Sequence, residues 1–248
     1  MVKHIPNTIT ALGLLCGFLS ILSTLTGNIT IAVYLVFIAA IFDFFDGFAA
    51  RLLNAWSELG KQLDSLSDLI SFGLAPSLIL FHEIADASGY SLSNVDISYL
   101  SPVQILIFLS PGLIVLASAF RLAKFNIDTK QDTQFIGLPT PASGLFLASL
   151  PLIRNSGISE FIDKLLNQPL VLMAITLVLA YLLVSKFPMF SMKIKHLKDK
   201  NNIPVFILLT ISLILLILFS LKAVFVIIIL YIFMSLVIFT LPKKNIES

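Results

Sequence analysis

The chain has 248 residues, of which 58% are hydrophobic and 12% charged, and its formal net charge is +2. This composition excludes an ordinary soluble protein, in which about a quarter of the residues are charged. Basic residues are scattered along the chain rather than grouped with aromatic ones, so we expect no nucleic-acid partner. The single cysteine, Cys16, lies in an apolar segment and excludes a disulfide framework.

Eight mostly apolar segments are long enough to cross about 30 Å of hydrocarbon. They predict an all-α polytopic membrane protein. Proline and glycine interrupt the fifth segment, which membrane helices tolerate. Only Lys222 separates the last two, whose combined length exceeds one crossing. The expected spans are 8–26, 30–50, 62–82, 103–122, 140–155, 169–186, 203–220 and 222–241.

The distribution of Lys and Arg predicts the orientation of these spans. Of the 16 basic residues, only Arg154, Lys164 and Lys222 fall on one side of the membrane. Cytoplasmic loops retain positive charge, so both termini and the connection between spans two and three should be cytoplasmic. We expect a catalytic transmembrane domain over 1–186, a basic cytoplasmic loop over 187–202, and two additional spans with a short tail over 203–248.

Four aspartates flank the connection between the second and third spans. Asp43 and Asp46 are three residues apart, and Asp64 and Asp68 are four apart, so each pair shares one helical face. The short connection predicts antiparallel neighbouring helices, across which all four carboxylates can face one another. Too few basic residues lie nearby in the sequence to neutralise them, which disfavours a purely structural role in helix packing.

Close carboxylates repel one another unless cations or protons relieve the repulsion. Oxygen ligands without His or Cys favour Mg²⁺ or Mn²⁺ over Zn²⁺. We therefore predict two divalent ions bound by Asp43, Asp46, Asp64 and Asp68. Such a pair leaves positions open for phosphate oxygens and can stabilise an in-line displacement at phosphorus.

The residues around the aspartates suit a phosphate-containing substrate. Gly47 and Gly60 lack side chains, and Ala50 has a small one, so a substrate or a neighbouring helix can approach the backbone closely. Arg51 carries a planar, permanently charged guanidinium suited to phosphate. These types of residue predict a phosphoryl-transfer site.

This stretch resembles the signature of the CDP-alcohol phosphotransferase family, D-x2-D-G-x2-A-R-x8-G-x3-D-x3-D, at every fixed position over 43–68. The resemblance implies a core of six transmembrane helices and a site open to the cytoplasm. It also implies transfer of a phosphoalcohol group from a CDP-linked donor to an acceptor hydroxyl, with release of CMP. Asp43, Asp46 and Asp64 would be metal ligands, and Asp68 both a ligand and the catalytic base. The CDP-binding residues would be Asp43, Gly47, Ala50, Arg51 and Gly60.

Three further stretches, "HIPNTITALGLLCG", "SAFRLAKFNID" and "FIGLPTPASG", look like those of the bacterial and archaeal phosphatidylserine synthase branch. This resemblance covers roughly residues 4–186. It implies CDP-diacylglycerol as the donor, L-serine as the acceptor, and phosphatidylserine and CMP as products. It also implies a location in the cell inner membrane and a homodimer among membrane lipids.

Polar residues at the same cytoplasmic end extend the expected site. Arg121, Lys124 and Asn126 end the fourth span, where positive charge could hold a phosphate or the serine carboxylate. Ordinary interfacial anchoring is the alternative explanation. Asn7 and Thr10 could contact the nucleotide or cap the first helix.

Two alternative functions stay open from the sequence. The same chemistry could use glycerol 3-phosphate, inositol or inositol phosphate, although a phosphorylated acceptor would need more basic residues than Arg121 and Lys124. An ion-coupled or proton-coupled transporter also uses intramembrane acids. It would place them near the bilayer midplane, between repeat-related broken helices.

Overall fold

The computed structural model describes residues 4–91, 98, 100–127, 135–154, 156–189 and 202–240. Within these ranges the regular structure is helical except for two short strands. β1 (Phe135–Ile136) and β2 (Pro188–Met189) pair in antiparallel orientation. The predicted all-α class of membrane protein is confirmed.

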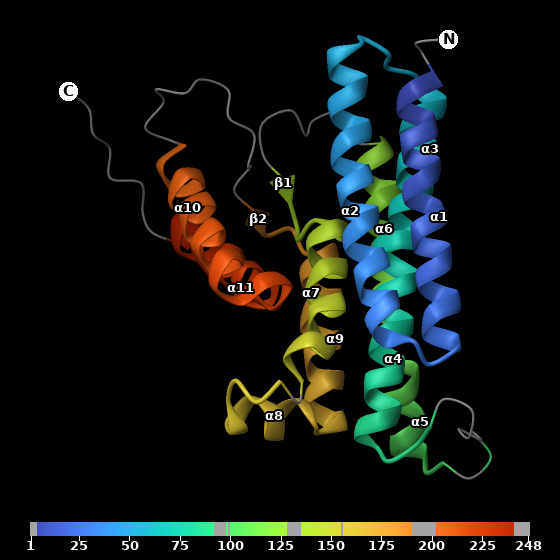
Figure 1. The fold of residues 1–248 in the computed structure, drawn as a ribbon, viewed down its shortest axis with the longest axis vertical. Coiled ribbons are helices and arrows are strands. Elements are labelled where there is room, and N and C mark those ends of the chain that lie inside the picture. Colours follow the sequence, from blue (N-terminus) through green and yellow to red (C-terminus); the bar gives the residue numbers. More distant parts are fainter. Residues whose placement is uncertain are drawn as a thin grey trace.

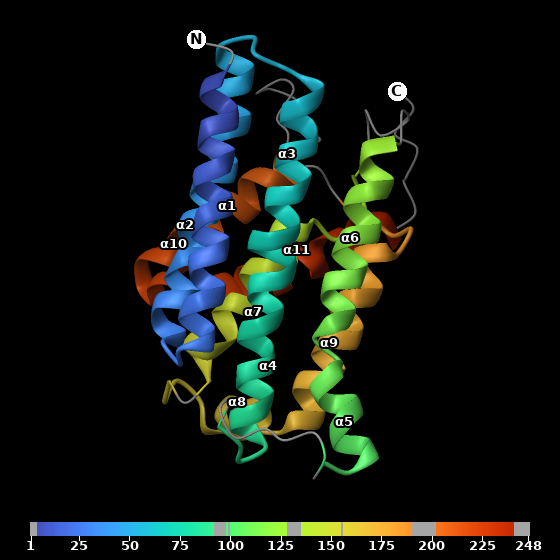
Figure 2. The ribbon, with the colours of Figure 1, turned by 90° about the vertical axis from the view of Figure 1, so that its right-hand side faces the viewer.

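Six helical segments stand side by side and form a bundle (Figures 1 and 2). The N-terminal end of the first segment lies at the same end of the bundle as the connection between the second and third (Figure 1). The expected antiparallel arrangement of the two aspartate-bearing helices is therefore present. The segments are α1 (Ile5–Leu25), α2 (Ile29–Leu52), α3 with η2 and α4 (Glu58–Asp68, Leu69–Leu74 and Ala75–Ala87), α5 with α6 (Pro102–Leu109 and Gly112–Ile127), α7 (Thr140–Ile153) and α9 (Pro169–Val184).

The apolar helices differ in part from the eight spans that the sequence predicts. Five helical stretches in the described part of the chain are long and apolar enough to cross a membrane. A sixth is added when α8 (Glu160–Leu166) and α9, which meet at an angle of 80°, are counted together. α7 has only 14 residues, and the last two expected spans join into one apolar stretch of 37 residues.

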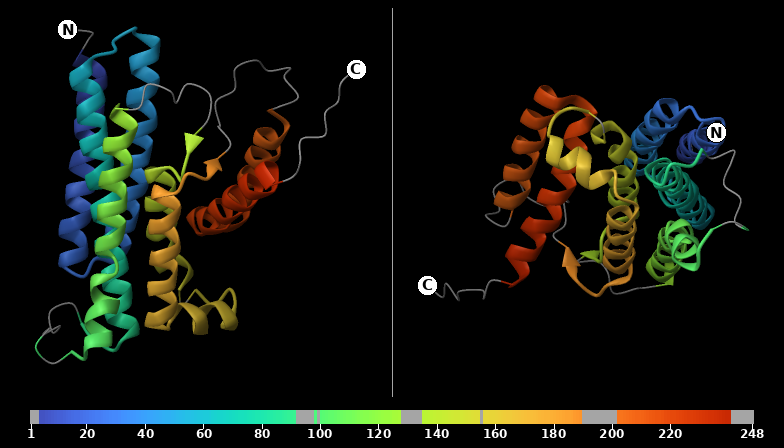
Figure 3. Two further views of the ribbon diagram at one scale, coloured as in Figure 1. Left: turned by 180° about the vertical axis from the view of Figure 1, so that it is seen from behind. Right: turned by 90° about the horizontal axis from the view of Figure 1, so that it is seen from below.

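That last stretch consists of α10 (Ile203–Phe219), the short helix η6 (Ser220–Lys222) and α11 (Ala223–Thr240). The chain breaks at Ser220, whose φ is 53°, close to the predicted separation at Lys222. Both helices run obliquely to the bundle (Figures 1 and 3), and Phe225 stacks on Phe146 of α7 with 5.0 Å between ring centroids. Most of the predicted basic loop 187–202 and of the tail lies outside the described residues.

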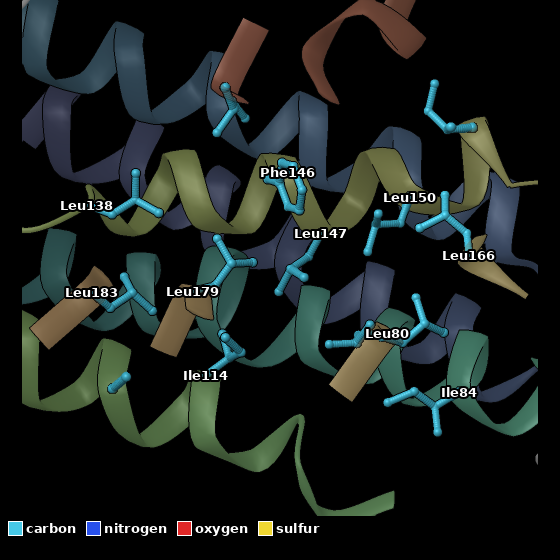
Figure 4. Packing of buried hydrophobic residues seen from close by; sticks show 14 of the residues in the cluster. Leu80, Ile84, Ile114, Leu138, Phe146, Leu147, Leu150, Leu166, Leu179 and Leu183 are labelled. Atoms are coloured by element: carbon cyan, nitrogen blue, oxygen red, sulfur yellow. The ribbon is translucent and has the colours of Figure 1, made fainter. Parts of the chain in front are cut away.

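α7 lies at the centre of the hydrophobic core. Its Leu147 and Leu150 are fully buried and point toward Leu80 of α4 and Leu179 of α9 (Figure 4). Other helices surround α7, so small residues that allow close packing suit it better than a continuous lipid-facing apolar surface. The proline and glycine that interrupt the predicted fifth span are consistent with this position.

Small residues let the helices approach closely around η2, a π-helical turn that directly follows Asp68. A Cβ atom placed on Gly17 of α1 would lie 2.5 Å from Ser71 Oγ. One placed on Gly144 of α7 would lie 2.7 Å from the Phe72 carbonyl oxygen. The two glycines therefore hold η2 between α1 and α7. The sequence predicts an uninterrupted helix here, and the π turn is a difference from that expectation.

An ion-pair network around the buried Arg154 and Glu83 joins the helices at the opposite end of the bundle. Arg154, at the end of α7, donates from Nη1 to Glu83 Oε2 at 3.0 Å and from Nη2 to Asp86 Oδ2 at 2.7 Å. Its Nε donates to Asn167 Oδ1 at 2.8 Å. Arg154 thus links α7, α4 and the junction between α8 and α9.

Candidate active site

The structure brings three of the four motif aspartates into one cluster. Asp43 comes from α2, and Asp64 and Asp68 come from successive turns of α3. Each offers a carboxylate oxygen, and these three atoms lie within 4.8 Å of one another. All three side chains are partly buried. Such a cluster of hard oxygen ligands fits a divalent cation.

Asp46 lies one turn after Asp43 and is only 6% exposed. Its Oδ2 is buried and has no hydrogen-bond partner within the described ranges. A buried carboxylate oxygen without a donor is costly, and a bound cation would remove that cost. The four aspartates therefore fit the divalent ions that the family resemblance implies.

Hydrogen bonds to α1 fix the aspartate-bearing helix. Ser67 Oγ donates to the Thr10 carbonyl oxygen at 3.3 Å, and Ser71 Oγ donates to the Gly13 carbonyl oxygen at 3.1 Å. At the start of α3, the Ser57 hydroxyl accepts a hydrogen bond from the Gly60 amide at 3.0 Å. This N-terminal cap sets where α3 begins and hence the direction in which its carboxylates point.

A cavity of about 510 Å³ opens beside the aspartates. It has room for a nucleotide, and most of the residues that the sequence assigns to CDP binding line it. Asp43, Asp68 and Arg51 are not on its wall, although Arg51 Nη1 lies 3.8 Å from the position of a Cβ on Gly47. The predicted residues on the wall are Asn7, Thr10, Asp46, Gly47, Ala50, Gly60 and Asp64.

A second cavity, of about 190 Å³, contains two of the three residues assigned to the acceptor. Arg121 and Lys124 line it, and Arg121 Nη1 donates to the Ile136 carbonyl oxygen at 2.9 Å. Phe125 lines both cavities and is a wall that they share.

Asn126 does not line the second cavity. Its side chain donates to Ser65 Oγ at 3.0 Å and to Gln62 Oε1 at 3.3 Å. Its carbonyl oxygen accepts a hydrogen bond from Lys61 Nζ at 2.9 Å. Asn126 therefore ties the end of α6 to α3, beside Asp64. This arrangement places it as a support of the aspartate helix.

Comparison with known proteins identifies the family of the chain. The model of the CDP-alcohol phosphatidyltransferase family matches residues 3–182, most of the length. The chain belongs to this family. Its members' fold and enzymatic class therefore apply to it, and it is a multi-pass membrane transferase.

Individual CDP-alcohol phosphatidyltransferases resemble the chain over similar ranges. The CDP-diacylglycerol–serine O-phosphatidyltransferase of Bacillus subtilis is 36% identical over 191 residues, which are 76% of this chain and 92% of that protein. The Helicobacter pylori (strain 26695) protein of the same name is 32% identical over 212 residues, 84% of this chain and 79% of that protein. The archaetidylserine synthase of Methanothermobacter thermautotrophicus is 34% identical over 150 residues, 60% and 58% of the two chains.

The CDP-alcohol phosphatidyltransferase match ends within α9, so α10 and α11 lie outside it. Within it, sequence reasoning missed several residues of the larger cavity. Trp56, Lys61 and Phe125 line its wall. Lys61 and Trp56 lie between the two halves of the aspartate motif, and this position in the sequence could have indicated that they line the cavity. Phe125 comes from a distant helix, and no local pattern marks it.

Proposed function

We propose that the chain transfers the phosphatidyl group from CDP-diacylglycerol to L-serine, giving phosphatidylserine and CMP. The observation that carries this proposal is the cluster of Asp43, Asp64 and Asp68 beside a cavity of nucleotide size. The choice of serine rests on the relatives, because two of them are named for a serine acceptor and one for archaetidylserine.

The larger cavity is the proposed donor site. Gly47 keeps part of its wall free of side chains, so the diphosphate can approach the backbone closely there, whereas Gly60 makes room for Asn7 and Ser57. On the outer surface beside Asp46, Phe45 and Phe48 line an apolar groove of about 390 Å³. This groove suits the donor's acyl chains, which would stay within the bilayer while the nucleotide reaches the aspartates.

The reaction we infer is a direct displacement at phosphorus. Asp68 takes the proton from the serine hydroxyl, and the resulting oxygen forms a bond to the phosphorus that bears diacylglycerol. The bond from that phosphorus to the CMP oxygen breaks, and Arg51 stabilises the departing phosphate charge from its place beside Gly47. Two Mg²⁺ or Mn²⁺ ions held by Asp43, Asp46, Asp64 and Asp68 would supply the Lewis acidity that neutralises charge on the diphosphate.

The smaller cavity is the proposed acceptor site. Its volume of about 190 Å³ suits a small amino acid, and Lys124 and Arg121 give it positive charge for the serine carboxylate. These two basic side chains suit the single carboxylate of serine better than a phosphorylated acceptor, because the latter carries more negative charge. The wall at Phe125, which both cavities share, supports a donor and an acceptor bound next to each other.

The position of the site in the membrane belongs to the same proposal. The surplus of basic residues beside the motif supports an active site and both termini on the cytoplasmic face of the inner membrane. The homodimer stays a prediction.

The experiment is CMP release by the purified protein with CDP-diacylglycerol and Mg²⁺ or Mn²⁺. Serine, glycerol 3-phosphate and inositol are compared as acceptors. We expect release with serine, and Asp68→Asn should lower kcat at least about hundredfold because it removes the base. Glu160→Gln is the control, since Glu160 is an exposed carboxylate of α8. Release with another acceptor would overturn the assignment of serine, and no release with any acceptor would overturn CDP-diacylglycerol as the donor.

A further inference from the structure

Trp56 is the only tryptophan of the chain, and it lies on the wall of the proposed donor cavity. Its side chain is 70% exposed, whereas the backbone on both sides is fixed. Ala55 before it is buried, and its amide donates to the Ala50 carbonyl oxygen at 3.0 Å. Ser57 after it caps α3. A fixed backbone thus presents a large aromatic ring to the cavity.

The cavity has two chemically different regions. Asp46 and Asp64 are the motif aspartates on its wall, toward which the metal-bound diphosphate of the donor would point. The nucleoside must then extend away from them, along the remaining wall. Trp56 and Phe125 are the aromatic side chains on this wall, and Phe125 also belongs to the second cavity. Of these two aromatic residues, Trp56 therefore borders the donor cavity alone.

We propose that Trp56 stacks on the nucleobase of the donor and so contributes to nucleotide binding; this inference rests on the proposed function. Every nucleobase has a flat π face, and stacking on an aromatic side chain is a common source of nucleotide affinity. The neighbouring wall residues Asn7, Ser57 and Glu58 offer hydrogen-bonding groups to the edge of the base. A base stacked on the indole would cover part of its exposed face.

Anchoring at the lipid headgroups is the competing role for an exposed tryptophan. The surroundings of Trp56 argue against it. Trp56 lies on the wall of the cavity that also carries Asp46 and Asp64. The outward-facing aromatic residues of α2, such as Phe45 and Phe48, line a different, wholly apolar groove.

The test uses the fluorescence of this single tryptophan in the full-length protein with Mg²⁺. Titration with CMP should change the emission with saturation, because the base stacks on the indole. Inorganic pyrophosphate fills the phosphate region without a base and should leave the emission nearly unchanged. Trp56→Phe should abolish the signal, which assigns it to this residue.

Activity supplies a second measurement. Trp56→Ala should raise the KM for CDP-diacylglycerol about 5-fold to 100-fold and change kcat less than about twofold. Trp56→Phe should keep much of the affinity, because a phenyl ring still stacks. Phe161→Ala, at an exposed aromatic residue of α8, is the matched control and should leave the KM unchanged.

The failure of this inference differs from the failure of the proposed function. The same emission is also recorded with brominated lipid. If calorimetry detects CMP binding but the tryptophan emission changes only with brominated lipid and not with CMP, Trp56 is an interfacial anchor and the stacking role is refuted. An unchanged KM in Trp56→Ala would refute it too. If no acceptor yields CMP and calorimetry detects no nucleotide binding, the proposed function itself fails.

Discussion

Substitution of Gly17 by alanine tests whether close packing around the π turn positions Asp68, the proposed catalytic base. The added Cβ would lie 2.5 Å from Ser71 Oγ and 2.9 Å from Ser71 Cα. Carbon atoms in good contact are about 3.5–4.0 Å apart, so α1 and η2 must separate by roughly 0.6 Å or more. A new rotamer of Ser71 cannot relieve the overlap, because one of the two atoms belongs to the backbone.

The expected cost follows from this displacement. Overpacking of a close contact destabilises a protein by about 1–3 kcal/mol. Ser71 is three residues after Asp68, so the shift also reaches the catalytic carboxylate. A misplacement of about 1 Å can lower a rate about hundredfold, and we expect kcat to fall about tenfold to hundredfold. KM for serine should change little.

Gly13→Ala on the same helix is the matched control. There the added Cβ would lie 3.4 Å from Phe42 Cβ, close to ordinary contact. Alanine also favours a helix over glycine by about 1 kcal/mol, so this variant should be as stable as the parent. The measurements are CMP release and the midpoint of thermal unfolding in detergent. Equal activity and stability of the two variants would refute the positioning role of η2.

Three further predictions concern other parts of the molecule. Arg154→Met should lower the free energy of unfolding by about 3–5 kcal/mol, because it leaves Glu83 buried without its guanidinium partner, and adding Glu83→Gln should restore part of the loss; an unchanged unfolding midpoint would contradict this. Lys124→Met should raise the KM for serine about tenfold or more by removing a charge-assisted contact, whereas Lys164→Met on α8 should not. Chelation of divalent ions should abolish CMP release, and Mg²⁺ or Mn²⁺ should restore it; full activity in the chelator would contradict the aspartate site.

The sequence determined the membrane class and the four aspartates of the proposed metal site. Apolar stretches of membrane-spanning length leave little choice of fold class, because backbone polar groups in lipid must be satisfied within helices. The three- and four-residue spacings place Asp43 with Asp46 and Asp64 with Asp68 on helical faces, since the α-helix has 3.6 residues per turn. Local periodicity was sufficient for both conclusions.

The tertiary structure decided which distant residues meet. No local pattern shows that Phe125 reaches the cavity beside Asp64, or that Asn126 supports α3 instead of lining the smaller cavity. The pairing of Arg154 with Glu83 likewise joins helices far apart in the sequence. Such contacts depend on how whole helices pack.

For the helices too, the sequence predicted some features and the tertiary structure decided others. Hydropathy located every apolar segment, including the short span 140–155 that becomes α7, but it could not predict that η2 is a π turn or that α10 and α11 run obliquely to the bundle. Hydropathy measures only the transfer of side chains into an apolar environment, and protein interior and lipid are both apolar. Which of the two surrounds a helix is set by its neighbours, because close approach at residues such as Gly17 and Gly144 depends on the helix that faces them.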